Sequence, residues 1–95
     1  MEITISTRRF EPTEKLLAYA NKEIDKLSRY FDGDLSGTVM LDESGNRKIV
    51  EARITALGKV MTVQLEGNDL YKLIPKAVDK LSRQLKSHKS KIRGR

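Results

Sequence analysis

The most distinctive group of side chains in this sequence is a set of cations near its C-terminal end. From Lys80 onward there are seven Lys and Arg residues and no Asp or Glu. All 13 acidic residues precede Lys80, so the formal net charge of +6 belongs to this last segment. Concentrated positive charge neutralises phosphates and releases their counterions, which predicts a polyanionic partner. The alternative is that the cations complement a helix dipole or serve solubility alone.

The sequence contains few residues that could support catalysis or metal binding. The single histidine, His88, falls on the apolar stripe of a predicted helix, and no catalytic triad can be assembled around it. The absence of Cys excludes disulfides, thiolate zinc sites and Cys nucleophiles. Asp32, Gly33 and Asp34 resemble the start of a calcium loop, but the later ligands are missing, and a helix-ending turn explains them better. We therefore expect no enzyme, no metal and no cofactor.

Hydrophobic periodicity predicts the elements that must position the cations. Apolar and polar residues alternate over 2–7, 34–42, 49–56 and 60–66, which is typical of half-buried strands. One helix is expected from the Thr13 cap to about Tyr30, and a second from Asn68 or Asp69 to the end of the chain. The apolar stripe of the first helix contains Leu16, Ala20, Ile24, Leu27 and Phe31, and that of the second contains Leu70, Ile74, Ala77, Leu81, Leu85, His88 and Ile92.

Two features interrupt this regular pattern. The cluster at 43–46 and the pair Gly58 and Lys59 predict tight reversals between consecutive strands. Pro75 lies inside the second helix, where a proline removes one backbone hydrogen bond at a cost of about 3 kcal/mol. We therefore expect a kink there, or a first turn set apart from the rest.

The element order β-α-β-β-β-α predicts an α+β fold. Each strand has one apolar face and each helix one apolar stripe, so both helices are expected on one face of a four-stranded sheet. The first helix forms the crossover between the first two strands, which makes the sheet mixed. A chain of 95 residues has room for one core, so we expect a single domain over 1–95. No apolar stretch approaches the roughly 20 residues of a membrane span and no secretory segment is evident, which predicts a cytoplasmic protein.

The basic positions on the predicted helices are the candidate RNA contacts. Those of the second helix lie on or beside the face opposite its apolar stripe: Lys80, Arg83, Lys86, Lys89 and Lys91. On the first helix, Lys22, Lys26 and Arg29 form a second basic row, which is either an RNA contact or a solvated face with local ion pairs. Arg8 and Arg9, at the end of the first strand, either extend a basic surface or blunt the strand end.

The strands indicate which kind of nucleic acid fits. An RRM stacks bases on aromatic side chains of its central strands, and the strands expected here contain no Phe, Tyr or Trp. A KH domain needs a G-x-x-G clamp, which is absent. A sheet with basic groups on its helices instead suits structured RNA, which is recognised through shape and phosphate contacts.

Three separated segments resemble a known family. Asp69, Leu70 and Tyr71 are followed by the run D-K-L-S-R-Q-L-K-S-H-K at 79–89, which is similar to the signature of the ribosome hibernation-promoting factors and ribosome-associated inhibitors (protein Y). The run K-L-S-R-Y-F at 26–31 and the pair Glu51 and Ala52 resemble further segments of that family. The resemblance covers essentially the whole chain, and Pro75 departs from the pattern.

The resemblance implies the same fold and a specific mode of action. A protein of this family is expected to bind the 16S-type rRNA of the small ribosomal subunit in the channel of mRNA and tRNA, as a free monomer before binding. It then blocks translation sterically and protects idle ribosomes during starvation or stationary phase. The positions carried over as rRNA contacts are Lys80, Arg83, Lys86, Lys89, Lys26 and Arg29, with Arg8 and Arg9 matching the family less closely. Long members add a C-terminal domain that pairs ribosomes, so the chain corresponds to a short form or to the N-terminal domain of a longer protein.

A second hypothesis belongs to a different class. The chain would then be a general domain for structured RNA or DNA, or a chaperone-like basic protein, without specificity for ribosomes. Competition with tRNA and mRNA for small subunits separates the two hypotheses.

Overall fold

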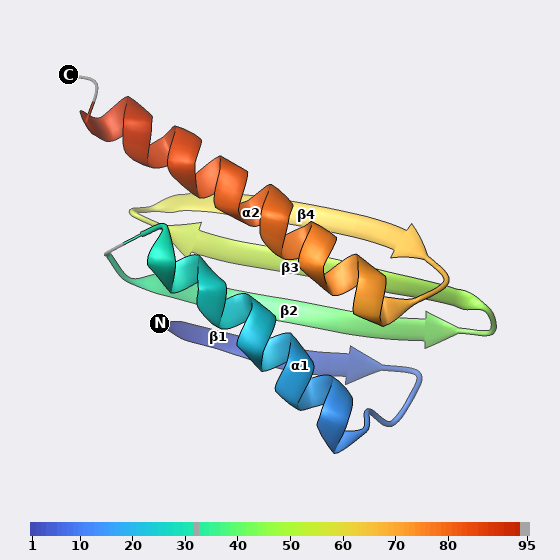
Figure 1. The fold of residues 1–95 in the computed structure, drawn as a ribbon. Coiled ribbons are helices and arrows are strands. Elements are labelled where there is room, and N and C mark those ends of the chain that lie inside the picture. The colour runs from blue at the N-terminus through green and yellow to red at the C-terminus, as the bar shows by residue number, and fades with distance from the viewer. Residues whose placement is uncertain (32, 94–95) are drawn as a thin grey trace.

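The elements follow one another in the predicted order β-α-β-β-β-α (Figure 1). The computed structural model describes residues 1–31 and 33–93, with side chains up to Ser87, so Asp32 and the side chains from His88 onward lie outside the described residues. The elements are β1 (Glu2–Arg8), α1 (Glu14–Asp25), the 3-10 turn η1 (Lys26–Arg29), β2 (Leu35–Ser44), β3 (Arg47–Ala56), β4 (Lys59–Gly67) and α2 (Leu70–Arg93).

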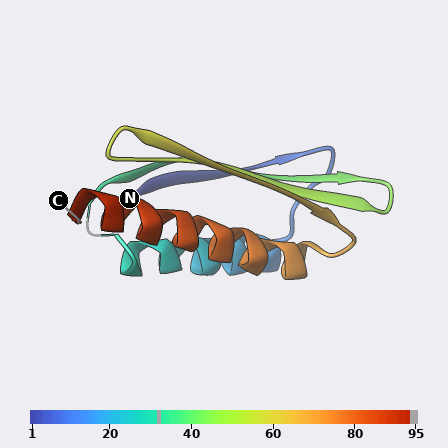
Figure 2. The ribbon, with the colours of Figure 1, turned by 90° about the horizontal axis from the view of Figure 1, so that it is seen from above.

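The strands form one mixed sheet in the order β1-β2-β3-β4. β1 pairs with β2 in parallel, and the other two pairs are antiparallel. Both helices cover the same face, and the opposite face is left open (Figure 2). The predicted fold class is therefore confirmed, and the sheet has a helix face and an open face.

The core lies between the helices and the sheet, as the period-two pattern predicts. Inward-facing residues alternate with exposed ones along β3, where Val50 and Ile54 are both 0% exposed. The helix stripes contribute equally buried residues, such as Leu27 and Leu85. Each Å² of apolar surface that is buried contributes about 25 cal/mol, so this layer is the main source of stability.

Both helices begin where the sequence predicts, whereas the α-helical part of the first helix ends earlier than predicted. The Thr13 hydroxyl accepts a hydrogen bond from the Leu16 amide at 3.0 Å, and the Asp69 carboxylate accepts one from the Tyr71 amide at 2.9 Å. The α-helical part of the first helix ends at Asp25, and the chain continues to Arg29 as a 3-10 turn. Tightening of the last turn is common at helix ends, because it supplies partners for carbonyl groups that lack one.

The first strand reversal is tighter than predicted, and the second is shifted by one residue. Gly45 and Asn46 alone connect β2 to β3, so both strands extend into the expected turn. Leu57 and Gly58 connect β3 to β4, one residue earlier than predicted. Their φ angles of 51° and 76° suit the two-residue hairpin turns that match the strand twist. The sequence pattern misplaced this turn by one residue because Leu is rare at positive φ.

Pro75 leaves α2 as one helix, so no separate first turn forms (Figure 1). The proline lacks the N–H that would bond to the carbonyl of Tyr71, four residues earlier. The Tyr19 hydroxyl of α1 donates to that carbonyl instead, at 3.2 Å. The two tyrosine rings also contact each other, with centroids 5.1 Å apart. A contact between the helices therefore satisfies the carbonyl group that the proline leaves without its helical partner.

Candidate nucleic-acid interface

The second helix presents a row of exposed cations on its side away from the core. Leu81 and Leu85, on the opposite side, are 1% and 0% exposed. Asp79 is the single acidic residue in the sequence of this helix. The helical period of 3.6 therefore separates an apolar side from a strongly basic one. The exposed cations are Lys72, Lys76, Lys80, Arg83 and Lys86.

Arg83 and Lys80 differ in their local partners. The Arg83 guanidinium lies 3.1 Å from the Asp79 carboxylate, and both side chains are mostly exposed, at 76% and 57%. Exposed pairs of this kind contribute about 0 to 1 kcal/mol, so the pair is easily exchanged for a phosphate contact. Lys80 makes no ion pair within the described residues. Both side chains border a groove between α2 and β4 that Thr62, Gln64 and Gln84 also line.

Lys86 connects the two basic rows. Its ammonium group lies 4.5 Å from the centroid of the Tyr30 ring, directly after η1. A cation over an aromatic face is attracted by the ring quadrupole, by about 0.5 to 1 kcal/mol at an exposed site. The contact joins this part of α2 to the residue that follows Arg29, which is itself exposed and makes no ion pair within the described part of the chain.

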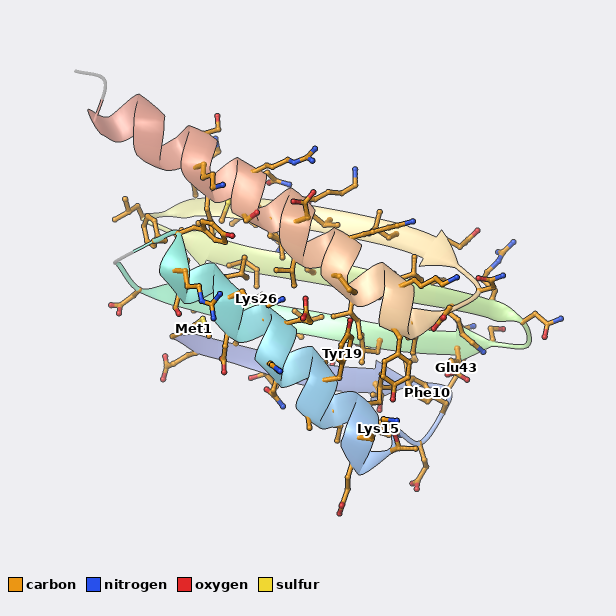
Figure 3. The ribbon with its side chains drawn as sticks, viewed as in Figure 1. Met1, Phe10, Lys15, Tyr19, Lys26 and Glu43 are labelled. Carbon is orange, nitrogen blue, oxygen red and sulfur yellow. The ribbon has the colours of Figure 1, made fainter. Side chains whose placement is uncertain are left out.

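The first helix carries its cations on the same side of the molecule. Lys22 is exposed, and Lys26 lies one turn further along the chain, directly after α1 (Figure 3). The Lys26 ammonium is 2.8 Å from the Glu23 carboxylate, which is largely buried. Lys26 is therefore partly neutralised by an ion pair with a neighbour in sequence. We use the name helix surface for Lys22, Lys26, Arg29, Lys80, Arg83 and Lys86.

Three predicted positions at the C-terminal end are placed only in part. The backbones of His88, Lys89 and Lys91 continue α2. Their side chains lie outside the described residues. The assignment of Lys89 and Lys91 as RNA contacts remains a prediction.

Arg8 and Arg9 are not on the helix surface. Arg8 alternates with the inward-facing residues of β1 and pairs with Asp42 of β2, so it lies on the open face of the sheet. Both guanidinium groups bind the Asp42 carboxylate, whose side chain is 0% exposed. Arg8 and Arg9 therefore lie apart from the two basic rows on the helices, and their assignment as RNA contacts remains a prediction. We use the name Asp42 cluster for Arg8, Arg9 and Asp42.

The electrostatics of the Asp42 cluster reflect this close contact. The hydrogen bond from Arg9, together with Arg8, lowers the pKa of Asp42 from 3.8 to about 2, although burial of the carboxylate acts in the opposite direction. Charge-assisted hydrogen bonds favour the ionised form over the protonated one. Asp42 is therefore a carboxylate at any physiological pH.

Charges elsewhere on the open face are mixed. Glu51 and Glu66 alternate there with Arg47 and Arg53. Arg47 lies 3.5 Å from Glu66, and Arg8 lies 3.6 Å from Glu51. The helix surface is consequently the more suitable of the two faces for a polyanion.

Sequence reasoning missed two partners of the predicted cations. Asp42 looked like the polar end of a strand, and its contact with Arg8 depends on the parallel register of β1 and β2. Tyr30 was assigned to a family segment without a role, and its contact with Lys86 depends on how the helices pack. Arg8 and Arg9 lie more than 30 positions from Asp42 in the sequence, so no local pattern indicates their contact.

Membrane-spanning helices and clusters of metal-binding side chains are both absent from the described part of the chain. No helix there is both long and apolar enough to cross a bilayer. No three metal-binding side chains come together among the described residues.

Comparisons with known proteins give a consistent picture. The sequence matches the family described as Sigma 54 modulation protein / S30EA ribosomal protein over residues 3–93. It is 32% identical over 91 residues to the ribosome hibernation promoting factor of Azotobacter vinelandii, covering 96% of this chain and 85% of the relative. It is 31% identical over 93 residues to the ribosome hibernation promoting factor of Escherichia coli strain K12, covering 98% of each.

Solved structures show the same fold. The N-terminal domain of Thermus thermophilus Protein Y superposes with a TM-score of 0.85 at 34% identity, over 93% of this chain and 99% of that one. A ribosomal subunit interface protein from Coxiella burnetii gives a TM-score of 0.85 at 22% identity, over 95% and 99% of the two chains. At that lower identity the likeness concerns the fold alone.

Proposed function

The chain belongs to the family of Sigma 54 modulation protein / S30EA ribosomal proteins, and from this premise we propose that it is a ribosome hibernation factor. This membership confirms the resemblance inferred from the three signature segments. Members of the family are binding proteins and not enzymes, which agrees with the expectation from the sequence. The proposed action is binding to the small ribosomal subunit in the cytoplasm, in the channel used by mRNA and tRNA, which blocks translation during stress or stationary phase.

The observation that supports this proposal is the position of the cations on α2. Five of them are exposed on one side of a helix that contains a single acidic residue. Neutralisation of phosphates by such a row releases counterions and supplies affinity without any base contact. The residues proposed to contact rRNA are those of the helix surface, together with Lys89 and Lys91, and with Arg8 and Arg9 on the open face of the sheet.

The mechanism requires a shape that stays rigid while it occupies the channel. The buried layer between helices and sheet and the Tyr19–Tyr71 contact hold the two basic rows relative to each other. The fold is elongated, with principal extents of 48 × 21 × 18 Å. A preformed, rigid domain loses little conformational entropy on binding. Inhibition then follows from exclusion of mRNA and tRNA, with no chemical step.

Competition on purified small subunits tests the proposal. We expect one copy of the chain, added as a monomer over 1–95, to bind each small subunit and to displace both initiator tRNA and mRNA. The measurement is co-sedimentation with separated subunits, followed by filter binding of labelled tRNA at increasing protein concentration. Salt dependence alone is not diagnostic, because any phosphate-binding protein loses affinity as salt rises.

The competing function is a structured-RNA-binding domain without ribosome specificity. In that case the chain would bind both subunits, or bind small subunits at several copies each, and tRNA binding would be undiminished. Either result would refute the ribosomal proposal while leaving RNA binding intact.

A further inference from the structure

Asp42 holds Arg8 and Arg9 in the same way, by one edge of each guanidinium. Arg8 Nε and Nη2 lie 3.0 and 2.8 Å from Oδ2 of the carboxylate. Arg9 Nε lies 2.9 Å from Oδ1, and its Nη2 also bonds to Oδ2. A guanidinium carries five N–H donors in a fixed plane. Each arginine therefore keeps both donors on Nη1 and one on Nη2 for another partner.

Both arginine side chains remain about half exposed to solvent. The Arg8 and Arg9 side chains are 49% and 52% exposed, whereas the carboxylate that holds them is 0% exposed. The backbone of Arg9 has φ of 68°, a left-handed conformation that is unfavourable for a residue with a Cβ. With this backbone conformation, the Arg9 guanidinium binds the same carboxylate as its neighbour in sequence. Two adjacent guanidinium groups are thus held on one carboxylate, with about half of each side chain exposed to solvent.

The charge of this arrangement is positive. Two cations share one carboxylate, and a further acid, Glu51, has an oxygen 3.6 Å from Arg8 Nη2 and a side chain that is 41% exposed. Planar guanidinium groups with several free donors suit the oxygens of a phosphate better than ammonium groups do. Orientation in advance also reduces the entropy lost on binding.

We propose that Arg8 and Arg9 together bind one backbone phosphate of RNA, and that Asp42 is the positioning residue that orients them for it. The inference rests on the proposed function and deepens it. It specifies the contact on the open face of the sheet, on the opposite side from the helix surface, so that rRNA contacts the domain from two sides.

Two neutralising substitutions with equal charge change provide the test. Asp42→Asn and Glu51→Gln each remove one negative charge beside Arg8. If the arginines act only as charges, both variants bind RNA at least as tightly as the native chain. If Asp42 positions the arginines, Asp42→Asn binds about tenfold more weakly than Glu51→Gln, which corresponds to the loss of about one charge-assisted hydrogen bond.

A third variant keeps the test valid if Asp42→Asn does not fold. Arg8→Lys combined with Arg9→Lys preserves every charge and removes the forked donors. We expect this double variant to bind more weakly than the native chain, with a circular dichroism spectrum like that of the native chain. All variants are titrated against small ribosomal subunits and against a short RNA duplex, with folding checked by thermal melting.

The outcomes separate the two proposals. Asp42→Asn binding as tightly as Glu51→Gln, or the double lysine variant binding like the native chain, overturns the positioning role. If the native chain binds the duplex but not the subunits, the ribosomal function fails, and the duplex titrations still decide the role of Asp42. If the native chain binds subunits and all variants do the same with equal affinity, the ribosomal function stands and the arginine inference fails.

Discussion

The helix surface and the Asp42 cluster use the same kinds of residue in opposite ways. Cations of the helix surface are exposed or half-buried, and the two that form ion pairs, Lys26 and Arg83, do so with acidic residues three or four positions away in sequence. Cations of the Asp42 cluster share a fully buried carboxylate that is 33 or 34 residues away in sequence. The first arrangement leaves the cations largely free for another partner. In the second, one carboxylate partly neutralises two guanidinium groups and binds both of them.

This difference shows that a count of basic residues does not locate a binding surface. An exposed ion pair contributes about 0 to 1 kcal/mol and yields readily to a phosphate. A buried carboxylate has lost its hydration and must keep its partners. The two regions should therefore respond differently to charge changes, pH and the loss of single hydrogen bonds.

Charge reversal on the helix surface is expected to have the largest effect. Arg83→Glu combined with Lys86→Glu should weaken binding to small subunits by about a hundredfold, because two attractive interactions with phosphates become repulsive. The slope of log Kd against log salt should fall by about 0.7 to 0.9 for each phosphate that the variant no longer neutralises. Thermal stability should change little, since both side chains are exposed.

The matched control reverses two charges away from the helix surface. Arg53→Glu combined with Lys59→Glu changes the net charge equally, and both side chains are exposed. We expect this control to weaken binding far less. Equal losses in the two double variants would mean that net charge alone governs affinity, and a large drop in Tm for Arg83→Glu with Lys86→Glu would show that those residues are structural.

Acid should reduce stability through the Asp42 cluster. The pKa of Asp42 is lowered from 3.8 to about 2 by its arginine partners, so its ionised form favours the folded state. This stabilisation is fully present above pH 3.8 and is lost as the pH falls toward 2. We expect Asp42→Asn to be less stable at neutral pH and to lose less stability in acid than the native chain. Urea unfolding between pH 2 and pH 7 measures both; parallel pH profiles would contradict the assignment.

The hydrogen bond that accommodates Pro75 should have a moderate effect. Tyr19→Phe removes the donor to the Tyr71 carbonyl and should reduce the free energy of unfolding by about 0.5 to 1.5 kcal/mol. Pro75→Ala restores an N–H in the helix for the same carbonyl. The effect of Tyr19→Phe should therefore be smaller in the Pro75→Ala background, as a double-mutant cycle by urea unfolding would measure. Strict additivity of the two changes would argue against the compensation.

The smallest effect is expected for the exposed pair on α2. Asp79→Asn removes the partner of Arg83 and should change the free energy of unfolding by no more than about 0.5 kcal/mol. Binding to small subunits should become slightly tighter, because Arg83 then has no competing carboxylate. A loss of affinity in isothermal titration would indicate that Asp79 orients Arg83, in the way that Asp42 is proposed to orient Arg8 and Arg9.

Much of the fold was readable from local patterns. Apolar residues at spacings of two or of three and four predicted every strand and both helices, because those periods follow from backbone geometry. Thr13 was predicted as the cap of the first helix and Asn68 or Asp69 as that of the second, and the structure shows caps at Thr13 and Asp69. The turn at Leu57 and Gly58 was misplaced by one residue, because neighbouring side chains do not report a positive φ in a residue such as Leu.

The sequence by itself determined which cations lie together along one helix, since the helical period alone sets their common side. Only the tertiary structure decided that Arg8 and Arg9 meet Asp42, and that Lys86 meets Tyr30. Those contacts depend on the pairing of β1 with β2 across a helical crossover and on how the helices pack. Register and packing are set by the burial of the whole core, so no local run of residues encodes them.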